Sequence, residues 1–151
     1  MMKFWGFVLM AAVMLPWIAR GDAQYYRAAD AQELYYTRGN AIFRRSDGQK
    51  LYDLRDNRIY RCSDNTPLYT ITEDTISHVD GHELYTFREG NLDRISNGRH
   101  VYYVRNNAIY RHVDGRKVLY FRGEDAKLIV FMVIMLEEAK TPRPGEPPVR
   151  L

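Results

Sequence analysis

Apolar and polar residues alternate along most of this chain in a unit that recurs about every 17 residues. The units begin at Leu34, Leu51, Leu68, Leu84, Val101 and Val118, so that the steps between them are 17, 17, 16, 17 and 17 residues. Each unit opens with about five residues rich in Tyr, Val, Ile and Thr, which are the types that suit a pleated sheet. The pattern therefore predicts a short strand at the start of every unit.

Turn-forming residues divide each unit at two regular places. The seventh position holds Asn, Asp or Gly in five of the units, and these types tolerate a positive φ angle. A second apolar run follows, such as Ile109 to Arg111, and in most units it ends at an Asp-Gly or Asn-Gly pair such as Asp114-Gly115. These pairs are typical of two-residue type I′ hairpin turns. We therefore expect strand, turn, strand, turn in each unit, with type I′ turns at the Asp-Gly pairs. The third unit lacks one residue, which predicts an irregular second strand there.

The two ends of the repeat region complement each other. Residues 25–33 match the second half of a unit, and residues 118–122 match the first half. Pairing of these terminal strands would close the structure and remove exposed sheet edges. We predict an all-β fold of about twelve short antiparallel strands in tandem hairpin repeats. A radial, propeller-like assembly, a barrel and a solenoid all remain open, although the paired turns favour hairpins over stacked coils.

Tyrosines and arginines recur at fixed places and are the candidate ligand contacts. These residues are Tyr52, Tyr69, Tyr85 and Tyr102 at the second position of the unit, and Arg55, Arg88 and Arg105 at the fifth. Together they would form an aromatic and guanidinium surface suited to a glycan or a protein partner. The alternative, which we favour, places the tyrosine rings in the core and the arginines on a solvated rim.

A different pattern begins after the last repeat. Nine consecutive apolar residues run from Leu128 to Leu136. Periodicity does not separate a helix from a buried strand here, and we expect a strand that enters at Leu128 and continues as a helix. The segment is too short to span a membrane and must be buried, either against its own chain or in an oligomer formed through Leu128 to Leu136. Residues 141–151 are rich in proline, which predicts an extended, disordered tail.

The N-terminal residues have the features of an export signal. A basic start at Lys3 precedes an apolar run from Phe4 to Ile18, and small residues stand at Gly21 and Ala23. We therefore expect residues 1–23 to be a signal peptide that is cleaved after Ala23, leaving one β-repeat domain at residues 24–140 with no transmembrane span. An uncleaved signal anchor is the alternative, but the run is shorter than the roughly 20 residues that a spanning helix needs. The mature protein would be secreted or periplasmic.

The unit Leu-Tyr-x-x-Arg-x-Asn-x-Ile-Tyr-Arg-x-x-Asp, seen from Leu51 to Asp64, resembles the short hairpin repeats of the bacterial beta-flower family. More loosely, it is similar to the tyrosine and Asp-Gly repeats of bacterial surface shells. The resemblance covers residues 25–122. It implies a pseudo-symmetric all-β fold and transfers no catalytic residue. This chain has more units than the four-fold members of that family and has no tryptophan in its units.

The distribution of charge limits the classes of partner, and the cysteine content limits the disulfides that the protein can form. The 22 basic and 19 acidic residues are interspersed, whereas nucleic-acid binding usually needs a concentrated basic face, so no nucleic acid is expected as a partner. The single cysteine, Cys62, excludes an internal disulfide. We favour a small, partly buried side chain at Cys62 over an intermolecular bridge or a reactive thiol, but its role stays open.

Few residues have the spacing of a catalytic or metal site. His78 and His112 occupy equivalent places two units apart and are the weak candidates for metal ligands, although turn-flanking surface histidines are the favoured interpretation. The sequence contains no Gly-rich phosphate loop, Gly-x-Ser-x-Gly elbow or His-Glu-x-x-His motif. We therefore expect neither an enzyme nor a cofactor.

These observations predict an exported, non-enzymatic β-repeat module for binding or assembly in the bacterial envelope or the extracellular space. The partner would be a protein or a glycan. The alternative is a carbohydrate- or peptidoglycan-directed protein, either lectin-like or hydrolytic.

Overall fold

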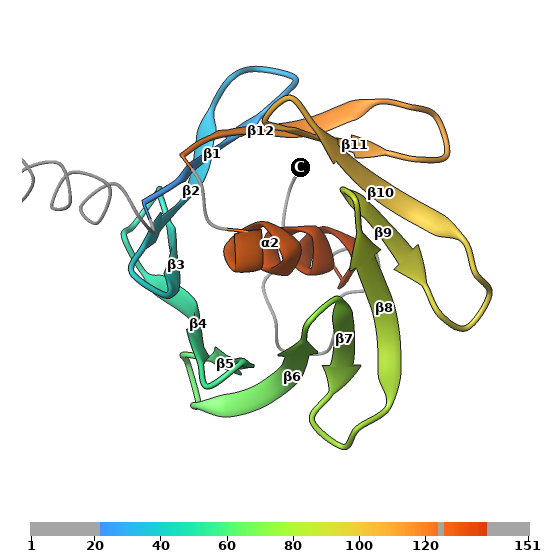
Figure 1. Ribbon diagram of the computed structural model, residues 1–151. Coiled ribbons are helices and arrows are strands. Elements are labelled where there is room, and N and C mark those ends of the chain that lie inside the picture. Colours follow the sequence, from blue (N-terminus) through green and yellow to red (C-terminus); the bar gives the residue numbers. More distant parts are fainter. Residues whose placement is uncertain (1–21, 124–125, 139–151) are drawn as a thin grey trace, which may run out of the picture.

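The computed structural model describes residues 22–123 and 126–138 and shows twelve strands and one helix (Figure 1). The strands are β1 (Gln24–Arg27), β2 (Glu33–Arg38), β3 (Ala41–Arg44), β4 (Lys50–Arg55), β5 (Arg58–Arg61), β6 (Thr66–Thr72), β7 (Thr75–His78), β8 (Glu83–Arg88), β9 (Asn91–Arg94), β10 (His100–Arg105), β11 (Ala108–Arg111) and β12 (Lys117–Arg122). The helix is α2 (Ala126–Glu138). The strands form a ring around the helix.

The twelve strands make one closed antiparallel barrel. Each strand pairs with its neighbours in sequence, and β1 pairs with β12 from Gln24↔Arg122 to Arg27↔Leu119. The prediction of about twelve antiparallel strands with paired terminal strands is thus confirmed. Of the three arrangements left open by the sequence, the chain adopts the barrel. Closure leaves no sheet edge unpaired.

The tightest turns lie between the two strands of each unit. Asp56 and Asn57 join β4 to β5 with φ angles of 51° and 62°, and Asn106 and Asn107 join β10 to β11 with φ angles of 52° and 60°. Two successive positive φ angles are the requirement of a type I′ turn. These residues therefore set the hairpin geometry.

The Asp-Gly pairs do not form the type I′ turns that we predicted. In the loop of residues 45–49, Gly48 has a φ angle of 69°, while Asp47 does not have a positive φ. The Asp47 carboxylate instead accepts a hydrogen bond from the backbone N–H of Gln49 at 3.1 Å and forms an ion pair with Arg44 at 2.8 Å. The side chain thus stabilises a five-residue loop in place of a second left-handed residue.

The missing residue of the third unit lies in a loop and not in a strand. β7 has four residues, as do β5 and β9, and its register shift between Ile76 and Ser77 matches the shift between Ile59 and Tyr60 in β5. The loop after β7 holds residues 79–82, one fewer than the loop after β3. The prediction of an irregular second strand was therefore wrong, because the loop absorbs the deletion.

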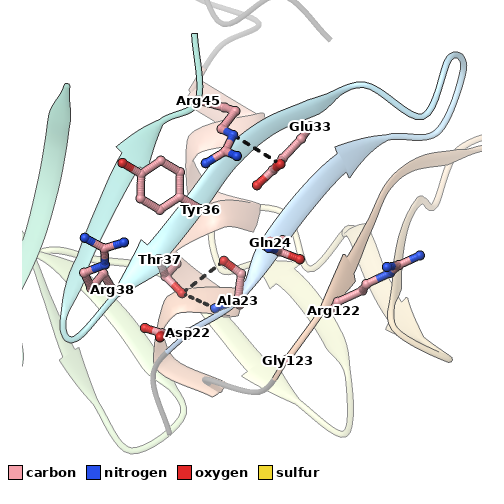
Figure 2. Close-up of a pocket in the computed structure, with 10 residues that line it drawn as sticks. All are labelled: Asp22, Ala23, Gln24, Glu33, Tyr36, Thr37, Arg38, Arg45, Arg122 and Gly123. Carbon is pink, nitrogen blue, oxygen red and sulfur yellow. Dashed lines mark hydrogen bonds and ion pairs between the residues drawn. The ribbon is translucent and has the colours of Figure 1, made fainter. Parts of the chain in front are cut away.

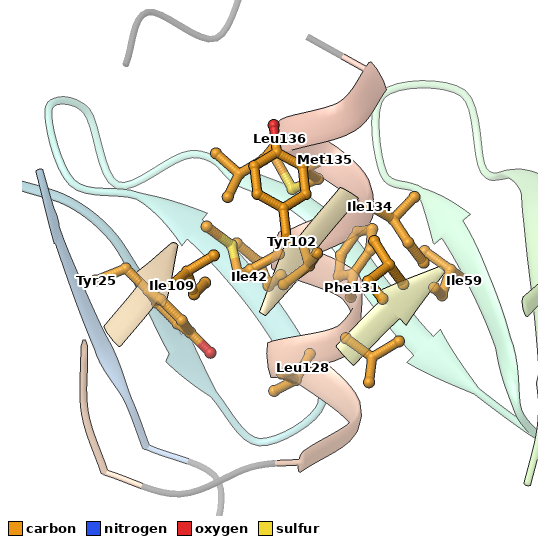
Figure 3. Packing of buried hydrophobic residues seen from close by; sticks show 14 of the residues in the cluster. Tyr25, Ile42, Ile59, Tyr102, Ile109, Leu128, Phe131, Ile134, Met135 and Leu136 are labelled. Carbon is orange, nitrogen blue, oxygen red and sulfur yellow. The ribbon is translucent and has the colours of Figure 1, made fainter. Parts of the chain in front are cut away.

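The core lies between the barrel wall and α2 (Figure 3). The second strand of each hairpin contributes one inward side chain that is fully buried, and these are Tyr25, Ile42, Ile59, Ile76, Leu92 and Ile109. On α2, Leu128, Met132 and Ile134 are also fully buried. A helix that is apolar on all sides needs apolar neighbours on all sides, and the inside of the barrel provides them.

The segment from Leu128 to Leu136 is helical throughout, so the expected strand at Leu128 was wrong. The physical reason is closure: β1 already occupies the free edge of β12, and a helix satisfies its backbone hydrogen bonds without a partner strand. The prediction of burial against its own chain is confirmed. An oligomer formed through these residues has no support, since the barrel covers them. In the described ranges, no helix combines the length and apolar content required to cross a membrane.

Candidate functional site

The tyrosines at the second position of the unit point into the barrel. Tyr69, Tyr85 and Tyr102 are 3%, 7% and 2% exposed. Tyr52 is partly exposed and packs edge-on against Phe131 of α2, with ring centroids 4.9 Å apart. Burial also raises the pKa of Tyr85. Buried rings do not present a ligand surface, and their burial agrees with the interpretation favoured above, in which these tyrosines pack in the core.

The arginines at the fifth position lie at strand ends and are exposed, but they differ in their partners. Arg55 forms an ion pair with Asp53 at 3.3 Å, and Arg88 forms one with Asp74. Arg105 makes no such pair with a carboxylate in the described part of the chain, and lies 5.7 Å from the centre of the Tyr103 ring. Arginines at the same position of the repeat thus have different partners in the structure.

The candidate metal ligands lie on different hairpins. His78 ends β7 and packs on Tyr69, whereas His112 follows β11 and stacks on His100 with ring centroids 4.9 Å apart. Within residues 22–123 and 126–138, no group of three or more His, Cys, Asp or Glu side chains is placed to hold a metal ion. Burial raises the pKa of the Cys62 thiol, which disfavours its reactive thiolate form.

A surface that the sequence analysis missed lies on the outside of the barrel. At the third position of three units, an outward aromatic ring stacks on the ring directly opposite it on the paired strand. The pairs are Tyr26 with Tyr120, Tyr36 with Phe43, and Tyr103 with Tyr110, with centroid distances of 5.0, 5.1 and 4.9 Å and interplanar angles of 9°, 7° and 6°. We call these six residues the aromatic face.

The aromatic face is continuous around half of the barrel. Its strands follow one another in the order β10, β11, β12, β1, β2 and β3. Tyr120 lies opposite Ala108, two residues from Tyr110 on the same strand, and such diagonal neighbours are about 7–8 Å apart. In the other half, the equivalent cross-strand pairs are Asp53 with Tyr60, Thr70 with Ser77, and Thr86 with Asp93. Only one half therefore presents stacked outer aromatic pairs.

Cationic side chains cover this face. The guanidinium groups of Arg38, Arg105 and Arg122 lie 5.9, 5.7 and 5.6 Å from the centres of the Tyr36, Tyr103 and Tyr26 rings. None of the three forms an ion pair with a carboxylate among the residues that the structure describes. All three stand at the fifth position of their units. They therefore keep an unbalanced positive charge beside an outward ring.

Charge follows the same division of the barrel. Residues 24–49 and 100–123, which carry the aromatic face, contain nine Lys and Arg and four Asp and Glu. Residues 50–99, which form the opposite half, contain seven Lys and Arg and nine Asp and Glu. The barrel thus has a basic aromatic half and an acidic half. The small net charge of the whole chain conceals this asymmetry.

A pocket opens at one end of the aromatic half of the barrel, where β1 meets β2 and β12 (Figure 2). Its volume is about 320 Å³, and polar side chains dominate its lining. Arg38 and Arg122 line it together with Tyr36, whose ring lies between Arg38 and Arg45. Arg45 is neutralised by Glu33 at 3.3 Å. The pocket therefore places two unpaired cations at one seam of the barrel.

The chain enters the barrel wall at the same seam. The backbone N–H of Ala23 donates a hydrogen bond to Oγ1 of Thr37 at 2.7 Å, and the Ala23 carbonyl accepts one from the Thr37 N–H at 2.8 Å. Ala23 is 2% exposed. The predicted signal peptide otherwise falls on residues 1–21, and the predicted tail falls on residues 141–151. Both lie outside the described residues, so these remain predictions.

No known family, no curated protein and no solved structure matches this chain. The resemblance to beta-flower repeats therefore stays a prediction.

Proposed function

We propose that the protein is a non-enzymatic binding module of the bacterial envelope or extracellular space, and that it takes its ligand on the aromatic face. The observation that carries this proposal is the restriction of the stacked outer aromatic pairs to one half of a repetitive barrel. A requirement of the fold would apply to all units, because all units build the same hairpin.

The opposite half shows that the fold does not need these rings. The hairpin of β6 and β7 has Thr70 opposite Ser77 at the outer position, and its barrel register is otherwise the same. Cross-strand aromatic pairs stabilise a sheet by only about 0.2–1 kcal/mol each. The tyrosines of this face are half-buried and the three arginines are exposed, and Tyr and Arg are enriched where proteins bind partners. The aromatic face is therefore better explained by recognition than by stability.

Because side chains fill the interior of the barrel, the outer surface is where we expect a ligand to bind. Side chains of α2 and of both strands of each hairpin form one buried apolar cluster inside the barrel. This arrangement supports a rigid scaffold that presents its outer face, and export to the envelope rests on the sequence of residues 1–23.

The proposal is tested by co-sedimentation of the purified protein with insoluble bacterial envelope material. We expect the wild-type protein to sediment with the envelope and the Tyr103→Ser variant to remain largely in solution. Tyr60→Ser is the control, because Tyr60 points outward on the opposite half, where it takes the place that Tyr110 has beside Tyr103, and it also lies under an arginine, Arg55, at 3.9 Å. Equal sedimentation of the two variants, with circular dichroism showing both folded, would refute the proposal.

A further inference from the structure

The three unpaired arginines of the aromatic face form a row. Arg105, Arg122 and Arg38 are the last residues of β10, β12 and β2, and each belongs to the fifth position of its unit. One strand separates each arginine from the next around the barrel, since β11 lies between the first two and β1 between the last two. Strands are about 4.8 Å apart, and the register offsets each arginine from the next by two residues along the strands, so the backbone positions of neighbouring arginines are about 12 Å apart.

The same row continues into the opposite half, where its charges are neutralised. Arg88 pairs with Asp74, Arg55 pairs with Asp53, and the remaining position is Thr72. At this position of the repeat, the arginines without an ion pair among the described residues are thus confined to three successive strand pairs. A ligand that matches this row carries negative charges at regular intervals and is long enough to reach from Arg105 to Arg38, which is about 24 Å.

The groups that the aromatic face presents are mainly hydrogen-bond donors. Guanidinium and ammonium groups have no acceptor, and a phenol can donate to an anion. The outward edge of an aromatic ring is also the positive part of its quadrupole. A ligand rich in acceptors, with carboxylates or sulfates, therefore complements the surface.

The ring stacking argues against nucleic acid as this polyanion. Bases bind such proteins by stacking on free aromatic faces. Each ring of the aromatic face has one side covered by its partner ring, and a cation lies over Tyr26, Tyr36, Tyr103 and Tyr110 as well. On these four tyrosines the ring edges and hydroxyl groups are left to the ligand, and sugar hydroxyls can pair with them.

From this geometry we propose that the aromatic face binds an acidic polysaccharide that carries one anionic group on alternate sugars. Two sugars of an extended chain span about the distance between neighbouring arginines of the row. Successive anionic groups then meet Arg105, Arg122 and Arg38, and the pocket at the seam accepts the uncharged sugar that lies between Arg122 and Arg38. Asp22 also lines this pocket, but within the described residues it forms no ion pair with either arginine.

This proposal deepens the proposed function and rests on it. The test uses a decasaccharide of hyaluronan, in which alternate sugars carry a carboxylate, and an amylose oligosaccharide of equal length as the neutral probe. Binding of the purified protein is measured by isothermal titration calorimetry at low and at physiological salt. We expect binding to hyaluronan that weakens with salt, and no binding to amylose.

Matched variants distinguish binding by this row of arginines from a general effect of positive charge on the protein. Arg38→Gln, Arg105→Gln and Arg122→Gln should each weaken hyaluronan binding roughly tenfold, because each loses one charge-assisted contact. Arg55→Gln and Arg88→Gln remove the same charge at the same repeat position on the opposite half and should leave the affinity within about twofold, since an ion pair with an aspartate already occupies each of these arginines.

The outcomes distinguish the two proposals. Any of four results would overturn the acidic polysaccharide while leaving the aromatic face as a binding surface. The first two are an equal loss of affinity in Arg55→Gln and Arg105→Gln, and binding of amylose as tight as that of hyaluronan. The other two are no binding to hyaluronan, and tighter binding to single-stranded DNA or to vesicles containing phosphatidylglycerol. Envelope sedimentation that is insensitive to Tyr103→Ser would instead remove the proposed function itself.

Discussion

Truncation of Phe131 to alanine tests whether the C-terminal helix holds the barrel together from within. Phe131 lies on α2, is 2% exposed, and packs edge-on against Tyr52 of β4 with an interplanar angle of 85°. Removal of a buried phenylalanine ring costs about 3–5 kcal/mol of unfolding free energy. The barrel wall is closed by strand pairing on all sides, so it has little freedom to collapse onto the void. We therefore expect a cost that is not below the middle of this range, about 4 kcal/mol.

That cost is large for a domain of this size. Small domains have unfolding free energies of about 5–15 kcal/mol, so the substitution would remove a substantial part of the total. At roughly 4 °C per kcal/mol, the melting temperature should fall by about 15 °C. The change is measured by urea denaturation followed by far-ultraviolet circular dichroism, with a thermal melt as a second measurement.

Val113→Ala is the matched control, because Val113 is also apolar but is 85% exposed in a loop of the barrel. Its effect should stay within about 0.5 kcal/mol. A double-mutant cycle with Tyr52→Leu should give a coupling energy of about 0.5–1.5 kcal/mol for the edge-on ring pair. If Phe131→Ala costs no more than Val113→Ala, the helix does not pack inside the barrel, and the account of the core given above is wrong.

Two further predictions concern the connections between strands. Gly90 has a φ angle of 80°, and a Cβ atom there would lie 2.8 Å from the carbonyl oxygen of Val104, whereas Gly98 has a φ angle of 65° and open space around it. Gly90→Ala should therefore cost about 2–4 kcal/mol and Gly98→Ala about 1 kcal/mol in urea denaturation, and equal costs would contradict the turn geometry. The Arg111 guanidinium, with help from a backbone N–H, lowers the pKa of Asp114 to about 2. Because this pKa lies below the unfolded value of about 3.9, the stabilisation is present above that pH and is lost as the pH falls towards 2. A carboxyl NMR titration should give the low pKa, Asp114→Asn should flatten the loss of stability between pH 4 and pH 2, and a normal pKa for Asp114 would show that the loop contact does not form in solution.

The hairpin array was predictable because its signals are local and repeated. A turn residue such as Asn57 or Asn107 limits the backbone directly, and each of the five two-residue turns has a positive φ at one or both of its residues, which reverses the chain. Closure was predictable from the half unit at each end, which left β1 and β12 without other partners. The exact turn type at Asp114-Gly115 was not predictable from the pair alone, because the Asp114 side chain accepts a hydrogen bond from the N–H of Arg116 and makes a longer loop stable.

The helix and the candidate site depend on interactions that are distant in sequence. Nine apolar residues suit a strand or a helix equally well, and only the occupied edge of β12 decides between them. Likewise, Tyr102 and Tyr103 are chemically the same, and alternation shows only that they point to opposite sides. The first is buried and the second is outward because the closed barrel surrounds α2. The sequence did contain a usable signal for the aromatic face, since the third position of the unit is aromatic in only some units.

The repeats provide an internal comparison between what the fold needs and what it permits. At the inward position of the second strand, four units have isoleucine and one has leucine, and all five side chains are fully buried around α2. At the outward third position the units hold Tyr, Asp or Thr, although the strand register there is the same. Packing therefore holds the inner position nearly constant in every unit, and leaves the outer position free to differ. Because the outer aromatic rings and the unpaired arginines occur in the same three successive strand pairs, we attribute this difference between units to the binding function proposed above.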